Sequence, residues 1–152
     1  MTINYKAKYI VSNSQTVLKD KVIQIQEGKI SRVVEEKDLP EKSHIEDLGN
    51  VAIVPGFVNA HSHVGLVSVK GLGHSNASAL YDVMWGIEPH LTEDDVYKLS
   101  CLGILDCISS GTTSINDHYF FSEGVAKACI DTGMRGFIGH TVMTEYGPWT
   151  GE

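Results

Sequence analysis

The order of short apolar runs and helical patterns after residue 55 constrains the fold more than any other feature of this sequence. Runs rich in apolar or β-branched residues at Phe57–Ala60, Thr112–Asp117 and Phe137–Val142 are typical of strands. Helical patterns from Thr92 to about Gly111 and from Glu123 to Thr132 separate these runs. This alternation predicts right-handed βαβ units around a parallel sheet, with strands buried on both faces.

Both expected helices carry boundary signals. Thr92 is a good N-cap, and Asp95 three residues later completes a capping-box pattern. The second helix is expected to be capped by Ser122 and to end at Gly133. The sequence therefore predicts where these helices begin and end.

Residues 1–54 show a different pattern, typical of short strands. Apolar and polar side chains alternate from Ile3 to Val11, as in a half-exposed strand. Two further runs, Val22–Gln26 and Ile30–Val34, flank a Glu-Gly-Lys turn in which Gly28 supplies the positive φ that a hairpin needs. We expect a small antiparallel sheet of three or four strands in residues 1–54, followed by a second domain in residues 55–152.

Charge and composition exclude several classes of partner. The formal net charge is −7 and lysine and arginine do not cluster, so neither a nucleic acid nor an anionic membrane is expected to bind. The first residues contain no continuous apolar stretch, which argues against a signal peptide or a transmembrane helix there. The cysteines form no C-x-x-C pair and favour a cytoplasmic protein with reduced thiols: Cys101, Cys107 and Cys129. The sequence leaves open whether the protein forms a homo-oligomer.

Two histidines follow the first run of the second domain, in the segment P-G-F-V-N-A-H-S-H. Side chains two apart on a strand share a face, so His61 and His63 are expected to point the same way. Two such imidazoles can chelate one metal ion and leave positions open for water and substrate. A bare His-x-His pair also occurs by chance at strand ends, so the pair alone is a weak signal.

The extended segment from Pro55 to His63 resembles the first metal motif of the amidohydrolase superfamily. Asn59 and the Ser-Gly-Thr-Thr at residues 110–113 are similar to the branch of cytosine deaminases, triazine hydrolases and 8-oxoguanine deaminases. A helix C-cap followed by a β-branched strand also explains Ser-Gly-Thr-Thr, so this segment supports the fold more than the function. The resemblance implies an α/β chain. A small β-sandwich portion (1–54) would precede the first three βα units of a TIM-like (β/α)8 barrel (55–152), which is incomplete in this chain. It also implies that His61 and His63 bind zinc, with iron as the alternative.

Two further residues are candidates for a substrate pocket. Trp85 is expected in the loop after the first strand, where it could stack on a planar heterocycle or simply pack against the barrel rim. Asp117 and His118 end the second expected strand, and an Asp-His pair followed by an aromatic is similar to triazine hydrolases and 8-oxoguanine deaminases. That pair is expected to face the barrel mouth, with His118 near the substrate rather than as a metal ligand. A solvated loop pair is the alternative.

The resemblance implies a metal-dependent hydrolase that acts on non-peptide carbon–nitrogen bonds and deaminates or dechlorinates a small nitrogen heterocycle. The family's catalytic proton-transfer residues match nothing here and are expected downstream. The chain ends in loop-like sequence at residues 146–152, so we interpret it as a fragment that is inactive alone. Two alternatives stay open. One is a non-catalytic interaction module with relic histidines, and the other is a cyclic-amide hydrolase of the hydantoinase or dihydroorotase type.

Overall fold

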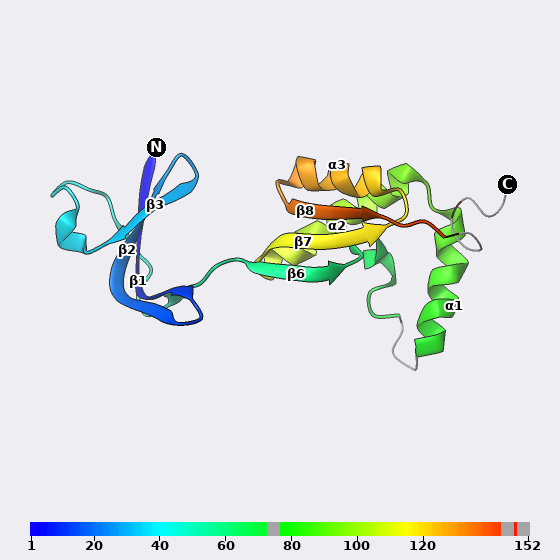
Figure 1. The fold of residues 1–152 in the computed structure, drawn as a ribbon, viewed down its shortest axis with the longest axis horizontal. Helices are drawn as coiled ribbons and strands as arrows, with labels where there is room; N and C mark the ends of the chain where they lie inside the picture. Colours follow the sequence, from blue (N-terminus) through cyan, green and yellow to red (C-terminus); the bar gives the residue numbers. More distant parts are fainter. Residues whose placement is uncertain (73–76, 144–147, 149–152) are drawn as a thin grey trace. The chain divides into compact units, whose positions relative to one another are not determined.

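The computed structural model describes residues 1–72, 77–143 and 148, and the chain divides into two units, Met1–Pro55 and Gly56–Glu152 (Figure 1). Each unit has its own sheet.

The first unit is a five-stranded mixed sheet. Strand β1 (Thr2–Asn13) pairs antiparallel with β2 (Thr16–Gln26), which pairs antiparallel with β3 (Lys29–Val34). The turn between β2 and β3 contains Gly28 with a φ of 75°, as the hairpin pattern predicted.

The expectation of a purely antiparallel sheet is wrong for this unit. Two short strands, β4 (Glu46–Asp47) and β5 (Ala52–Ile53), pair with β1 in the parallel sense. After the short 3-10 helix η1 (Glu36–Asp38), the chain returns alongside β1 and runs in its direction. Backbone bonds from Lys8 to Gly49 and from Tyr9 to Val51 stabilise that pairing.

The second unit contains a three-stranded parallel sheet in the order β6-β7-β8, as the strand–helix alternation predicted. Its strands are β6 (Phe57–Ser62), β7 (Thr112–Tyr119) and β8 (Arg135–His140). The connecting segments hold η2 (Val64–Val69), α1 (Ala77–Ile87), η3 (Glu88–His90), α2 (Glu93–Ser109) and α3 (Ser122–Thr132). The unit is therefore a mixed α/β structure built of βα units (Figure 1).

Helices α2 and α3 cover one face of this sheet. Ile115 of β7 is fully buried against Val96 and Val125 of these helices. On the opposite face Val58 is 67% exposed and Phe137 is 72% exposed. The expectation of strands buried on both faces is therefore wrong for the described residues, because they supply a helical layer on one side only.

The helix boundaries were predicted in part. Thr92 caps α2 with its capping box: Thr92 Oγ1 accepts from the Asp95 amide, and the Asp95 carboxylate accepts from the Thr92 amide. Gly133 ends α3 in the left-handed conformation. Ser122 does not cap α3, however. Its hydroxyl bonds the His140 ring instead, and Phe121 occupies the N-cap position without a side-chain bond.

Trp85 lies in a helix, α1, and not in the expected loop. Tyr81 and Trp85 are four residues apart, so their rings meet on one side of α1 with centroids 5.6 Å apart. Among the described residues, no helix is both long and apolar enough to cross a bilayer. The cysteines are free, and burial raises the pKa of Cys129 to about 11, so this thiol stays protonated at neutral pH.

Candidate metal centre

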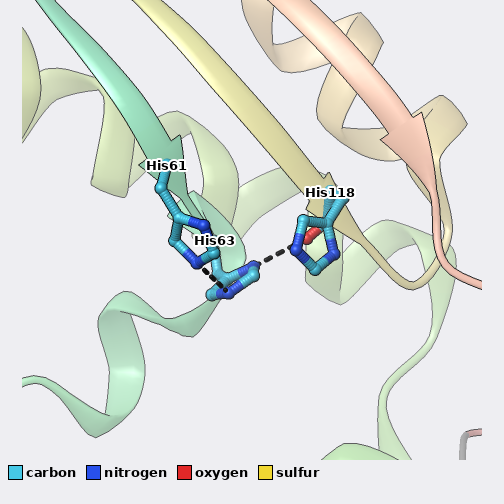
Figure 2. A group of neighbouring side chains, drawn as sticks. All are labelled: His61, His63 and His118. Carbon is cyan, nitrogen blue, oxygen red and sulfur yellow. Dashed lines mark hydrogen bonds between the residues drawn. The ribbon is translucent and has the colours of Figure 1, made fainter.

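Three histidines meet at the carboxyl ends of two neighbouring strands (Figure 2). His61 lies on β6, His63 follows one residue beyond its end, and His118 lies near the end of β7. Each offers a ring nitrogen, and these nitrogens all lie within 4.8 Å of one another. The structure thus brings His118 together with the predicted pair.

The geometry of His61 and His63 fits one small metal ion. Their Nε2 atoms lie 3.2 Å apart, with the rings nearly perpendicular at 84°. Two zinc–nitrogen bonds of about 2.0–2.1 Å at a tetrahedral angle would separate two nitrogens by roughly 3.3 Å. The spacing therefore suits chelation of a single ion by the two rings.

Strand alternation explains why both rings point the same way. The side chain of Ser62 faces the helical layer, where its hydroxyl bonds Asp117 and the carbonyl of Asn116. Its two neighbours therefore project to the opposite side. The strand ends at Ser62 after a register shift with β7, so His63 owes its position to the following turn as well as to the strand.

A backbone contact determines which nitrogen of His63 is available. Nδ1 of His63 lies 2.7 Å from the carbonyl oxygen of His118, a contact drawn as a dashed line in Figure 2. A carbonyl only accepts hydrogen bonds, so Nδ1 is the donor, and in the neutral ring the lone pair then lies on Nε2. This is the arrangement that metal-binding imidazoles commonly adopt.

His118 packs edge-on against both other histidines. Its ring centroid lies 4.4 Å from that of His63 and 5.6 Å from that of His61. Its Nδ1 lies 3.2 Å from the hydroxyl oxygen of Thr141. His118 is therefore close enough to act on a bound metal or on a ligand beside it.

Asp117 faces away from the histidines, so the expectation that it faces the barrel mouth with His118 is wrong. Adjacent strand residues point to opposite faces, and Asp117 is buried on the side of the helices. Its Oδ2 accepts hydrogen bonds from Ser62 Oγ at 2.9 Å and from the Val64 amide at 2.7 Å. Burial raises the pKa of the Asp117 carboxyl, and the bond from Val64 opposes that rise. Because adjacent residues of a strand point to opposite faces, the sequence could have indicated that Asp117 and His118 do not face the same side.

A cavity of about 250 Å³ adjoins the histidines. Both candidates for substrate binding, Trp85 and His118, line it with His63. The other lining side chains are mostly aromatic or apolar: Leu66, Tyr81, Met84, Glu88, Tyr119, Phe120, Thr141 and Met143. The cavity can therefore hold a largely apolar, planar group next to the ring nitrogens.

A buried hydrogen bond in this cavity wall was not anticipated from the sequence. Tyr119 donates to the carboxylate of Glu88 at 2.8 Å, and both side chains are buried. Glu88 lies in η3, directly after the helix that was expected to be a loop. The bond joins that segment to the end of β7.

The Amidohydrolase family matches residues 52–146 of the chain. A 5'-deoxyadenosine deaminase of Methanosphaera stadtmanae is 34% identical over 88% of this chain and 33% of its own length. A 5-methylthioadenosine/S-adenosylhomocysteine deaminase of Pyrococcus furiosus is 33% identical over 93% of this chain and 32% of its own length. The chain spans about a third of the length of the curated relatives it matches.

Solved structures share the fold at lower identity. A zinc complex of an atrazine chlorohydrolase from Arthrobacter aurescens superposes with a TM-score of 0.76 at 19% identity, over 98% of this chain and 37% of that one. An adenosine deaminase from Xanthomonas campestris with bound zinc gives 0.69 at 22% identity, over 89% of this chain and 33% of that one.

Proposed function

The chain belongs to the amidohydrolase family, and from this premise we propose that the complete gene product is a metal-dependent aminohydrolase. It cleaves a non-peptide carbon–nitrogen bond of a small nitrogen heterocycle. The three parallel strands are the first of a (β/α)8 barrel, residues 1–54 belong to a β-sandwich, and the histidines mark the barrel mouth. The observation that carries this proposal is the 3.2 Å approach of the His61 and His63 Nε2 atoms beside an aromatic-lined cavity.

His61 and His63 hold the metal. The chemistry of the donors favours zinc, with ferrous iron as the alternative, because neutral imidazole suits both ions. When bound, the ion supplies Lewis acidity that lowers the pKa of a coordinated water toward neutrality. The chain's own part is to present two unprotonated Nε2 atoms, and the His118 carbonyl does so for His63 by holding the proton on Nδ1.

Trp85 and His118 bind the substrate from two sides of the cavity. Trp85 is 54% exposed and lies with Tyr81 on α1, which leaves ring surface available to a planar heterocycle. His118 offers a ring nitrogen within 4.8 Å of the other two histidines, close to where the reacting atom would lie. The aromatic and apolar wall would also exclude bulk water from the reacting centre.

A 6-aminopurine nucleoside altered at its 5' position is the proposed substrate. This choice rests on relatives about one third identical in sequence that are 5'-deoxyadenosine and 5-methylthioadenosine/S-adenosylhomocysteine deaminases. In the reaction water replaces the exocyclic amine, and ammonia leaves. Dechlorination of a triazine is the second choice, because the atrazine chlorohydrolase is only 19% identical.

The test is ammonia release by the complete gene product. Protein reconstituted with zinc or with ferrous iron is incubated with 5'-deoxyadenosine, 5-methylthioadenosine, guanine or a cyclic amide, and chloride release from atrazine is measured in parallel. We expect the first two to be hydrolysed fastest. Preferred hydrolysis of the cyclic amide would favour the hydantoinase-type alternative. Absence of both turnover and stoichiometric metal would favour the interaction module.

A further inference from the structure

We propose that Asp117 is a positioning residue of the metal centre, one that fixes the turn bearing His63 without touching the metal. The proposal rests on the proposed function in one respect, which is that His61 and His63 hold a metal. It assigns a role to a buried side chain that faces away from the histidines.

The carboxylate of Asp117 binds the residues on both sides of His63. One oxygen, Oδ2, accepts from the hydroxyl of Ser62 and from the backbone amide of Val64, at 2.9 and 2.7 Å. These donors precede and follow His63 in the chain, so the carboxylate clamps the backbone from which the ring projects. The contacts join β7 to the last residue of β6 and to the first residue of η2, more than fifty residues away in sequence.

The same strand also orients the ring itself. His118, the residue after Asp117, places its carbonyl oxygen 2.7 Å from His63 Nδ1. Adjacent residues of β7 therefore bind His63 from two directions, one through its backbone neighbours and one through its ring. Together they hold His63 Nε2 at 3.2 Å from His61 Nε2.

Because Asp117 is buried, its carboxylate depends on the two hydrogen bonds to the turn. Asp117 is 1% exposed, and its second oxygen, Oδ1, has no hydrogen-bond partner among the described residues. A buried carboxylate is unfavourable unless its hydrogen bonds compensate, and charge-assisted bonds are about twice as strong as neutral ones. The two bonds to the turn therefore offset part of the cost of burying the Asp117 carboxylate.

The experiment measures metal affinity apart from fold stability. Zn²⁺ binding to the metal-free complete gene product is titrated against a chelator, and Co²⁺ absorption spectra report the ligand geometry. Asp117→Ala should weaken Zn²⁺ binding by about 10–100-fold, the usual effect of losing a group behind a metal ligand. Asp117→Asn should recover part of this loss because its amide oxygen still accepts. Ser62→Ala, which removes one of the two donors, should lie between wild type and Asp117→Ala.

Asp131→Ala is the matched control. One oxygen of Asp131 also accepts two hydrogen bonds, here from the side chains of Tyr97 and Lys127, but away from the histidines. Its loss should lower the urea midpoint of the metal-free protein and leave Zn²⁺ affinity and the Co²⁺ spectrum unchanged. If Asp117 only stabilised the fold, Asp117→Ala would likewise lower the urea midpoint and leave Zn²⁺ affinity and the Co²⁺ spectrum unchanged.

Zn²⁺ affinity within twofold of wild type in Asp117→Ala would overturn the proposal. If Asp117→Ala does not fold, Asp117→Asn and Ser62→Ala provide the test. Wild-type Zn²⁺ affinity and Co²⁺ spectra in both of these variants would overturn the proposal. His61→Ala, titrated alongside, separates this failure from failure of the proposed function. Retained Zn²⁺ in His61→Ala would refute the metal assignment itself, whereas loss there with normal binding in the Asp117 series would refute only the clamp.

Discussion

At the scale of single residues, the candidate centre depends on how each histidine is held. His63 has both ring nitrogens engaged, Nδ1 against the His118 carbonyl and Nε2 toward His61. His61 is more exposed than His63, and its Nε2 lies 3.2 Å from Nε2 of His63. Because the His61 side chain is exposed, we expect its replacement to affect the metal more than the fold.

We expect His61→Ala to abolish stoichiometric zinc binding in the complete gene product, with turnover falling alongside. The loss should exceed the roughly 100-fold that removal of a group behind a ligand causes, because a ligand itself is removed. Metal analysis after dialysis and ammonia release measure the two effects. His140→Ala is the control, since His140 also ends a strand but bonds Ser122. Full metal content and activity in His61→Ala would refute the assignment.

At the scale of elements, helix α2 positions the turn that follows His63. A Cβ built on Gly103 of α2 would lie 2.3 Å from the carbonyl oxygen of Val64. The helix therefore approaches the first residue of η2 more closely than any side chain would allow. Gly103 is needed for that contact, although glycine is a poor helix former.

We expect Gly103→Ala to destabilise the protein by about 1–3 kcal/mol, because overpacking outweighs the gain in helix propensity. Gly86→Ala in α1 is the matched control. A Cβ there meets nothing within 4 Å, so this change should be neutral or stabilising. Urea unfolding of both variants measures the difference. Equal stability of the two would contradict the packing argument.

The capping box of α2 leads to a second prediction at this scale. Thr92→Ala removes the acceptor for the Asp95 amide and should lower the unfolding free energy by about 1 kcal/mol. Ser122→Ala should lower it less, because Ser122 makes no capping bond at the start of α3. A larger loss in Ser122→Ala, measured by the same urea unfolding, would show that the caps have been misassigned.

At the scale of the whole molecule, the second unit leaves apolar surface uncovered. Phe57, Val58 and Phe137 are 60%, 67% and 72% exposed, and β8 pairs with β7 alone among the described strands. Exposed apolar patches and free strand edges both promote association. The uncovered face is the one from which His118 projects.

We therefore expect the 152-residue chain expressed alone to be oligomeric, aggregated or loosely packed. Sedimentation velocity gives the size distribution, and hydrogen exchange reports the protection of the strand edge. A monomer that unfolds cooperatively and protects its amides from Phe137 to Val142 would contradict this expectation. Phe137→Lys should reduce association, because it places a charge on the exposed face.

Local patterns in the sequence were enough to predict much of this protein. The parallel βα order, the capping box at Thr92, the turn at Gly28 and the shared direction of His61 and His63 all follow from periodicity or from residues a few positions apart. Such features are encoded locally, because helix and strand periods and cap bonds involve neighbouring residues.

Only the tertiary structure decided which distant segments meet. The approach of His118 to His63, the hydrogen bond from the Val64 amide to Asp117 and the parallel pairing of β4 with β1 join residues some 40 to 55 positions apart. Trp85 likewise lies on a helix whose apolar side faces the cavity. No local period specifies such partners, because they depend on which faces the packed strands and helices present to one another.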